Sequence, residues 1–396
     1  ALRSFYGPLE SGRRIALIIF GVLGTALIGA GIILLFAHNW NELTRPVRAA
    51  LSLGLLAVAQ ALAGWALIRK ADSAAWREAT AVFQVLAVGS SIALISQTYN
   101  IIGELDDFLL VWMVVILPVV YLMDSRAATV LYGCGIALWA ITASDSMRPL
   151  FWLLAAFAVP YVLQLARKRS PETRDRWVFW VLSGALVAAN IALCESLGSM
   201  WMLYLSGAAA GMYALSVLVG PESALRWPFA IASTGGIALT GLILTFEEPW
   251  GGSPPELTTA SVLSMAVAAG LFGLAVWQGI RLARRSRWPN LLVCAAPLFM
   301  TLGFALNDNP PNLVAVGLLN LYLFALGLTT LIVGLRRSHL GQANAGLLLL
   351  SALFVVRFFD EDLSMVLRGA SFIAVGAAFL VMNVRMFGRR RKEVQP

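Results

Sequence analysis

The residues best suited to chemistry are polar and charged side chains that follow long hydrophobic runs. An arginine guanidinium binds phosphate or carboxylate groups through paired N–H donors, and a nearby carboxylate can act as a base or as a second ligand. Such groups follow the first, third and thirteenth hydrophobic runs of the chain. Together they predict one polar site on a single side of a membrane, made of His38, Asn39, Trp40, Glu42, Arg45, Arg48, Gln97, Tyr99, Asn100, Asp106, Asp107, Arg357 and Asp360.

Three interpretations of this predicted site remain open. The charged residues can form a rim that anchors the ends of helices. Alternatively, Arg48 or Arg357 binds an anionic group while Asp106 or Asp107 acts as a base or second ligand. In the third interpretation, pairs of aspartates hold a divalent cation, because Ca²⁺ and Mg²⁺ prefer carboxylate oxygens.

The middle of each hydrophobic run contains no charged residue. Ion-coupled pumps generally place an ionisable side chain inside the membrane, where a proton or cation can meet it. Here the polar residues at mid-depth are neutral: Gln60, Gln84, Ser90, Ser91, Asn190, Thr240 and Asn320. We select Asn190 and Asn320 as candidates for a polar path, with hydrogen bonding between helices as the alternative.

Known catalytic and cofactor-binding motifs are absent from the sequence. It contains no P-loop, nucleophile elbow, HExxH motif or dinucleotide fingerprint. Cys134, Cys194 and Cys294 are far apart, and His38 and His339 are the two histidines. The sequence therefore predicts no catalytic residue, no metal site and no cofactor.

The composition identifies the solvent in which the chain folds. Hydrophobic residues make up 59% of the sequence and charged residues 13%, with a mean hydropathy of +0.80. A soluble domain averages roughly 45–50% apolar and about 25% charged residues. A soluble fold could not hide so much apolar surface, so the composition indicates a lipid bilayer.

Hydrophobic runs long enough to cross a bilayer recur along the chain and predict an all-α polytopic bundle of about 14 transmembrane helices. The first run is too long for the core of a signal peptide, and we interpret it as a retained span. We expect one integral membrane domain over 1–396, with an N-terminal segment at 1–14, helices over 15–385 and a basic tail at 386–396. The predicted spans are 15–37, 48–68, 79–97, 108–123, 127–142, 149–166, 177–194, 199–219, 227–245, 257–279, 289–305, 312–334, 342–357 and 364–385.

Charge segregation gives these helices a direction. With the N-terminus inside, 24 of the 29 basic residues fall on one side and 13 of the 21 acidic residues on the other. Cytoplasmic loops are the ones rich in Lys and Arg, so both termini are expected to be cytoplasmic. The net charge of +8 then reflects topology and contact with anionic lipids, and no nucleic-acid partner is expected.

Prolines and glycines inside the runs predict local features of the bundle. Pro118, Pro160 and Pro297 should kink their helices, either opening a cavity or merely shaping the bundle. Gly207 and Gly211 form a GxxxG motif, which predicts close helix packing. A weak similarity between 15–123 and 289–385 suggests a parallel repeat, with chance resemblance between apolar helices as the alternative.

The N-terminal third resembles a known family. Ala37-His38-Asn39-Trp40 ends the first run, and the third run ends in Gln97-Thr98-Tyr99-Asn100. This pattern over roughly 10–140 is similar to an uncharacterised bacterial family of predicted membrane proteins, with Asn-Trp after the first span and Gln-x-Tyr after the third. The resemblance implies localisation in a bacterial inner membrane and a polytopic topology, and it brings no activity.

Three functions remain open from the sequence. The leading hypothesis is transport or translocation of a hydrophobic, amphipathic or lipid-linked substrate, suggested by the number of spans, the prolines and the short loops. The second is a non-catalytic subunit, assembly factor or sensor with a protein partner in the membrane. The third is a membrane enzyme with an outward-facing acidic and arginine site. Membrane lipids, and a lipid-like or small-molecule substrate, are the expected partners.

Overall fold

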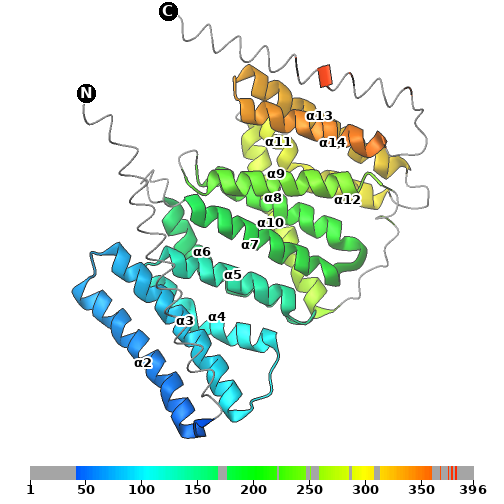
Figure 1. Ribbon diagram of the computed structural model, residues 1–396. Helices are drawn as coiled ribbons and strands as arrows, with labels where there is room; N and C mark the ends of the chain where they lie inside the picture. The colour runs from blue at the N-terminus through cyan, green and yellow to red at the C-terminus, as the bar shows by residue number, and fades with distance from the viewer. Residues whose placement is uncertain are drawn as a thin grey trace, which may run out of the picture. The chain divides into compact units, whose positions relative to one another are not determined.

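A computed structural model describes residues 42–167, 176–220, 223–246, 250, 258–284, 288–306 and 313–358, with single positions at 366, 373, 376, 377 and 380. Within these residues the chain forms α-helices and 3-10 turns, and no β-strand (Figure 1). The all-α prediction is therefore confirmed for this part of the chain. The predicted span 15–37, nearly all of 364–385, the segment 1–14 and the tail 386–396 lie outside the described residues.

The chain divides into two compact units, residues 1–104 and 105–396. In the first unit, α2 (Arg45–Arg69) and α3 (Ala74–Tyr99) form an antiparallel hairpin (Figure 1). The buried face of α2 consists of the small residues Ser52, Ala59, Ala63 and Ala66. Small side chains let two backbones approach closely, and Ser91 Oγ donates a 2.9 Å hydrogen bond to the Ser52 carbonyl across the hairpin.

The second unit contains the remaining helices. Their order is α4 (Leu105–Leu122), α5 (Arg126–Thr142), α6 (Leu150–Arg167), α7 (Arg176–Cys194), the 3-10 helix η2 (Glu195–Met200), α8 (Trp201–Leu218), α9 (Arg226–Ile243), α10 (Thr259–Arg284), α11 (Trp288–Cys294), α12 (Ala296–Ala305), α13 (Leu313–Arg336) and α14 (Leu340–Phe358). Figure 1 shows α7, α8 and α9 as long rods beside one another.

Helices lie over the twelve predicted spans from 48–68 to 342–357, with ends within five residues of the predicted ones. Several helices extend into charged flanks, because backbone hydrogen bonding continues past the apolar segment. The span predicted at 289–305 is interrupted at Ala295, just before Pro297, and forms α11 and α12. Proline lacks the N–H that a continuous helix needs, so this interruption lies where a kink is predicted at Pro297. In contrast, α4 and α6 continue through Pro118 and Pro160.

Eight of the described helices are long and apolar enough to cross a membrane: α2, α3, α4, α6, α7, α8 with the end of η2, α10 and α13. Three shorter apolar helices, α5, α12 and most of α14, accompany them. The chain is thus a membrane protein with several apolar helices.

Close packing around α8 confirms the prediction from Gly207 and Gly211. A Cβ atom at Gly207 would lie 3.0 Å from the Ala268 carbonyl oxygen of α10. At Gly211 it would lie 2.7 Å from the Leu271 Cβ atom. These separations leave no room for a side chain, so the motif brings α8 and α10 together.

Candidate functional site

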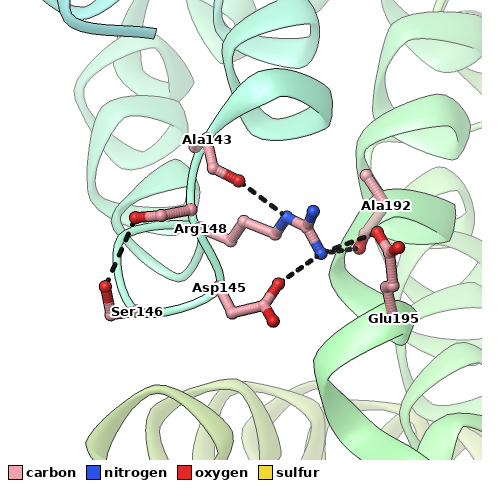
Figure 2. Close-up of polar contacts among 7 residues, drawn as sticks. Ala143, Asp145, Ser146, Arg148, Ala192 and Glu195 are labelled. Atoms are coloured by element: carbon pink, nitrogen blue, oxygen red, sulfur yellow. Dashed lines mark hydrogen bonds and ion pairs between the residues drawn. The ribbon is translucent and has the colours of Figure 1, made fainter. Parts of the chain in front are cut away.

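A buried arginine lies at the connection between α5 and α6. Ala143 ends α5 in an extended conformation, and the chain turns back so that the Arg148 N–H donates to the Ser144 carbonyl at 3.0 Å. The Arg148 residue is only 8% exposed. Its Nε donates to the Ala143 carbonyl at 3.0 Å, and Nη1 lies 3.4 Å from the Ala192 carbonyl near the end of α7 (Figure 2). The side chain therefore joins the ends of α5 and α7.

Two carboxylates accompany this guanidinium. Nη1 lies 2.8 Å from Asp145 Oδ1 and 2.9 Å from Glu195 Oε2 (Figure 2). The side chains of Asp145 and Glu195 are 68% and 72% exposed, so each ion pair is screened by solvent. Their main effect is to balance the charge of a cation whose own side chain is nine-tenths buried. We call Asp145, Arg148 and Glu195 the Arg148 triad.

The local backbone explains how Glu195 reaches this position. α7 ends at Cys194, and the short 3-10 helix η2 leads directly into α8 at Trp201. Gly198 within η2 has φ 48° and ψ −135°, which L side chains rarely adopt. The tight connection holds Glu195 beside the α5–α6 turn.

A chain of hydrogen bonds lies one helical turn from the triad. Trp152 Nε1 of α6 donates to the Tyr204 hydroxyl of α8 at 3.2 Å, and that hydroxyl donates to Asn190 Oδ1 of α7 at 2.8 Å. Asn190 Nδ2 donates to the Leu186 carbonyl at 2.7 Å. Asn190 is thus buried, and it links α7 to α8 through a hydrogen bond between helices.

An open groove of about 640 Å³ runs beside the triad. Its walls are apolar, and a carboxylate lies at its charged end. The lining residues come from α5, α7, η2 and α8: Ile141, Ala188, Ile191, Ala192, Cys194, Glu195 and Trp201. The groove is therefore shallow and amphipathic, since its lining is mostly apolar and includes one carboxylate.

The predicted site residues of the first unit lie at one end of the α2–α3 hairpin. Arg45 and Arg48 belong to the first turn of α2, while Gln97, Tyr99 and Asn100 end α3. Asn100 adopts φ 50° and its N–H donates to the Ser96 carbonyl, so it serves to terminate α3. Glu42, Arg45, Gln97 and Tyr99 are exposed, and Arg48 is half-buried.

The other predicted residues are spread over the second unit or lie outside the described residues. Asp106 and Asp107 occupy the first turn of α4, where negative charge favours a helix N-terminus. Asn320 is half-buried in α13, and its Nδ2 donates to the Val316 carbonyl at 2.8 Å. Arg357 belongs to the last turn of α14, and its side chain lies outside the described part of the structure. His38, Asn39, Trp40 and Asp360 lie wholly outside the described residues. A pairing of Arg48 with Asp106 or Asp107 stays a prediction, because they belong to different units.

The residues of the Arg148 triad are not among the site residues predicted from the sequence. One signal could have found it. In the predicted topology, 143–148 and 195–198 are loops on the same side of the membrane, and an arginine on the acidic side needs a carboxylate partner. Asp145, three residues before Arg148, and Glu195 in the next loop on that side are the available ones. Among the described residues, no group of three or more His, Cys, Asp or Glu side chains could hold a metal ion.

The fold defines a polytopic helical membrane protein with an amphipathic groove beside a buried arginine. Comparison with known families places its first third more narrowly: residues 1–129 match the family model described as "Predicted membrane protein (DUF2157)". The resemblance to an uncharacterised membrane-protein family is thus confirmed, over a segment that includes α2, α3, α4 and the start of α5. No curated protein and no solved structure matches the chain. The Arg148 triad lies beyond the matched segment.

Proposed function

We propose that this protein transports or translocates a hydrophobic, amphipathic or lipid-linked substrate in a bacterial inner membrane. About 14 spans, with both termini in the cytoplasm, form the transmembrane bundle. In this topology the Arg148 triad faces outward. The single observation that carries the proposal is the groove of α5, α7, η2 and α8, whose apolar lining includes Glu195, a member of the Arg148 triad.

The shape of the groove supports an amphipathic substrate. Ile141 and Ile191 on its walls are 48% and 59% exposed, so hydrocarbon can contact them from the side of the bundle. Glu195 provides a charged group at the end of the same groove. A molecule with an apolar chain and a polar headgroup would contact both the apolar walls and the carboxylate of the groove, whereas a small ion would contact only the carboxylate.

The polar residues inside the helices support transport without a buried carboxylate. Among the described residues, the buried polar side chains are Ser, Thr, Gln and Asn, together with Arg148 at a helix end. An Asp or Glu in the middle of a span is the usual partner for a coupling proton. None is buried in the described helices, which favours a route driven by the substrate gradient or by a partner protein.

The contacts of the triad also support the proposed topology. The turn that contains Arg148 and the turn that contains Glu195 touch each other, and two helices, α6 and α7, separate them in sequence. Two helices that each cross the membrane return the chain to its starting side. This agrees with both turns facing outward, as the distribution of Lys and Arg predicts.

Lipid movement in reconstituted vesicles tests the proposed function. The full chain is inserted into liposomes that contain a fluorescent phospholipid, and a membrane-impermeant reductant quenches the label in the outer leaflet. We expect the protected inner-leaflet fraction to decay faster than in protein-free liposomes. Equal decay with and without the protein, for phospholipid and for a polyprenyl phosphate probe, would contradict the proposal.

A further inference from the structure

The Arg148 guanidinium keeps donors that the protein does not use. Nε and Nη1 account for all its contacts within the described residues: Ala143, Ala192, Asp145 and Glu195. Figure 2 shows the other terminal nitrogen, Nη2, turned away from both carboxylates. Nη2 has no hydrogen-bond partner in the described part of the chain, yet it is not one of the fully buried atoms that lack a partner there. It therefore retains some exposed surface. Two N–H donors of a nine-tenths buried cation are thus open to a ligand.

The carboxylates of the triad also keep free acceptors. Arg148 contacts Asp145 through Oδ1 and Glu195 through Oε2, which leaves Asp145 Oδ2 and Glu195 Oε1 without a protein donor among the described residues. Both side chains are more than two-thirds exposed. The site therefore offers a cationic donor and anionic acceptors that point in different directions.

The charges of the triad select among ligands. The formal charges of one guanidinium and two carboxylates add up to −1. A ligand that carries only negative charge would gain a contact at Nη2 but would be repelled by two nearby carboxylates. A ligand that carries only positive charge would leave Nη2 unmatched. A zwitterion with separated charges satisfies both parts of the site.

We propose that the triad binds the headgroup of a zwitterionic aminophospholipid. Its phosphodiester accepts hydrogen bonds from Arg148 Nη2, and its primary ammonium donates to Glu195 and Asp145. One acyl chain lies in the apolar groove, against Ile141, Ala188 and Ile191. This inference rests on the proposed function, for which it names the substrate class.

The form of the amine follows from the same geometry. A primary ammonium has three N–H donors and can bind carboxylate oxygens directly. A quaternary ammonium has none, and it binds best inside a cage of several aromatic rings. The groove contributes one aromatic residue, Trp201. The triad should therefore prefer an ethanolamine headgroup to a choline headgroup that has the same phosphate and chains.

Lipid retention by the purified full chain tests this preference. Native mass spectrometry in mild detergent compares phosphatidylethanolamine, phosphatidylcholine and phosphatidylglycerol with identical acyl chains. We expect phosphatidylethanolamine to bind about fivefold more tightly than the other two lipids. This is the difference in affinity that one partly exposed charged contact provides. Glu195→Gln should remove most of this preference. Asp72→Asn, which removes an exposed carboxylate in the α2–α3 connection, should leave it unchanged.

Charge reversal gives a second, independent test. Asp145→Asn combined with Glu195→Gln changes the net charge of the triad from −1 to +1. The double variant should now favour phosphatidylglycerol over phosphatidylethanolamine. Equal binding of all three lipids by the unmodified chain would overturn the inference, as would an Asp72→Asn variant that loses the preference as fully as Glu195→Gln. Thermal unfolding of each variant shows whether it is folded, and a variant that is not folded is replaced by Glu195→Ala.

The binding and flux assays separate the two proposals. Selective binding of phosphatidylethanolamine without any lipid flux would support the headgroup site and contradict the transport function. Lipid flux together with equal binding of all headgroups would support transport and contradict the headgroup site.

Discussion

Arg148 illustrates how a single residue can determine the structure of a site in a membrane protein. A guanidinium is costly to bury, and this one is held by two backbone carbonyls and two carboxylates at the ends of α5 and α7. The contacts come from segments more than 40 residues apart in sequence. The residue is therefore expected to fix the relative position of these helix ends, in addition to any role in binding.

Replacing Arg148 should destabilise the second unit. Arg148→Ala removes the shared partner of two carboxylates and two carbonyls. Because the carboxylates are exposed and can be hydrated, we expect a loss of about 1–3 kcal/mol rather than the larger cost of a fully buried pair. Thermal unfolding in detergent measures it. Arg45→Ala, at an exposed position of α2, serves as the control and should change stability by less than about 0.5 kcal/mol. If the two substitutions lowered stability equally, the contacts of the buried Arg148 would not stabilise the second unit.

The Tyr204 hydroxyl provides a second test at this scale. Tyr204→Phe leaves Asn190 Oδ1 and Trp152 Nε1 without their shared partner, because the hydroxyl both accepts and donates. We expect a loss of about 1 kcal/mol, since hydrogen bonds between membrane helices are individually modest. The same unfolding measurement applies. Tyr99→Phe, which alters an exposed ring, should have no effect; if it matched Tyr204→Phe, the hydrogen-bond chain would have no structural importance.

At the scale of helices, much of the structure could be predicted from hydrophobic runs bounded by charged residues. The end of α7 at Cys194 follows directly from the sequence, because the apolar run stops there and the charged Glu195 comes next. The interruption between α11 and α12 follows from Pro297. The triad could not be selected in this way, because its formation depends on which loops touch. Asn100 was predicted as a site residue, and its left-handed conformation shows that it also ends a helix.

Close packing of α8 against α10 gives a prediction for this scale. Gly211→Ala places a methyl group against Leu271, and the resulting overlap should cost about 1–3 kcal/mol. Gly270→Ala in α10 is the matched control, because nothing lies within 4 Å of its added Cβ. It should be neutral or slightly stabilising, since alanine favours a helix. A Gly211→Ala variant that is as stable as Gly270→Ala would contradict the close packing of these helices.

For the whole molecule, the central expectation is that loops alternate between the two sides of the membrane. The apolar composition and the family match over residues 1–129 establish a membrane protein, and the sorting of basic residues predicts its orientation. Hydrophobic periodicity cannot reveal how the two compact units are arranged, since lipid-facing and partner-facing side chains are both apolar.

Cysteine labelling tests the proposed orientation. In a background without Cys134, Cys194 and Cys294, a cysteine replaces Ser144 in the α5–α6 turn or Ser338 in the α13–α14 turn. An impermeant maleimide added to intact cells should label Ser144→Cys but not Ser338→Cys, and lysis should make both reactive. The reverse pattern would contradict cytoplasmic termini, while labelling of both positions in intact cells would contradict the number of spans between them.

The most direct test of the account is lipid flux with the groove blocked. Ala188 lines the groove, so Ala188→Trp fills it with an indole ring, whereas Leu153→Trp adds the same ring at a 54% exposed position of α6 that does not line it. In reconstituted liposomes, the unmodified chain and Leu153→Trp should accelerate lipid movement, and Ala188→Trp should reduce it to near the protein-free rate. If Ala188→Trp were folded and as fast as the unmodified chain, the groove could not be the path of the substrate.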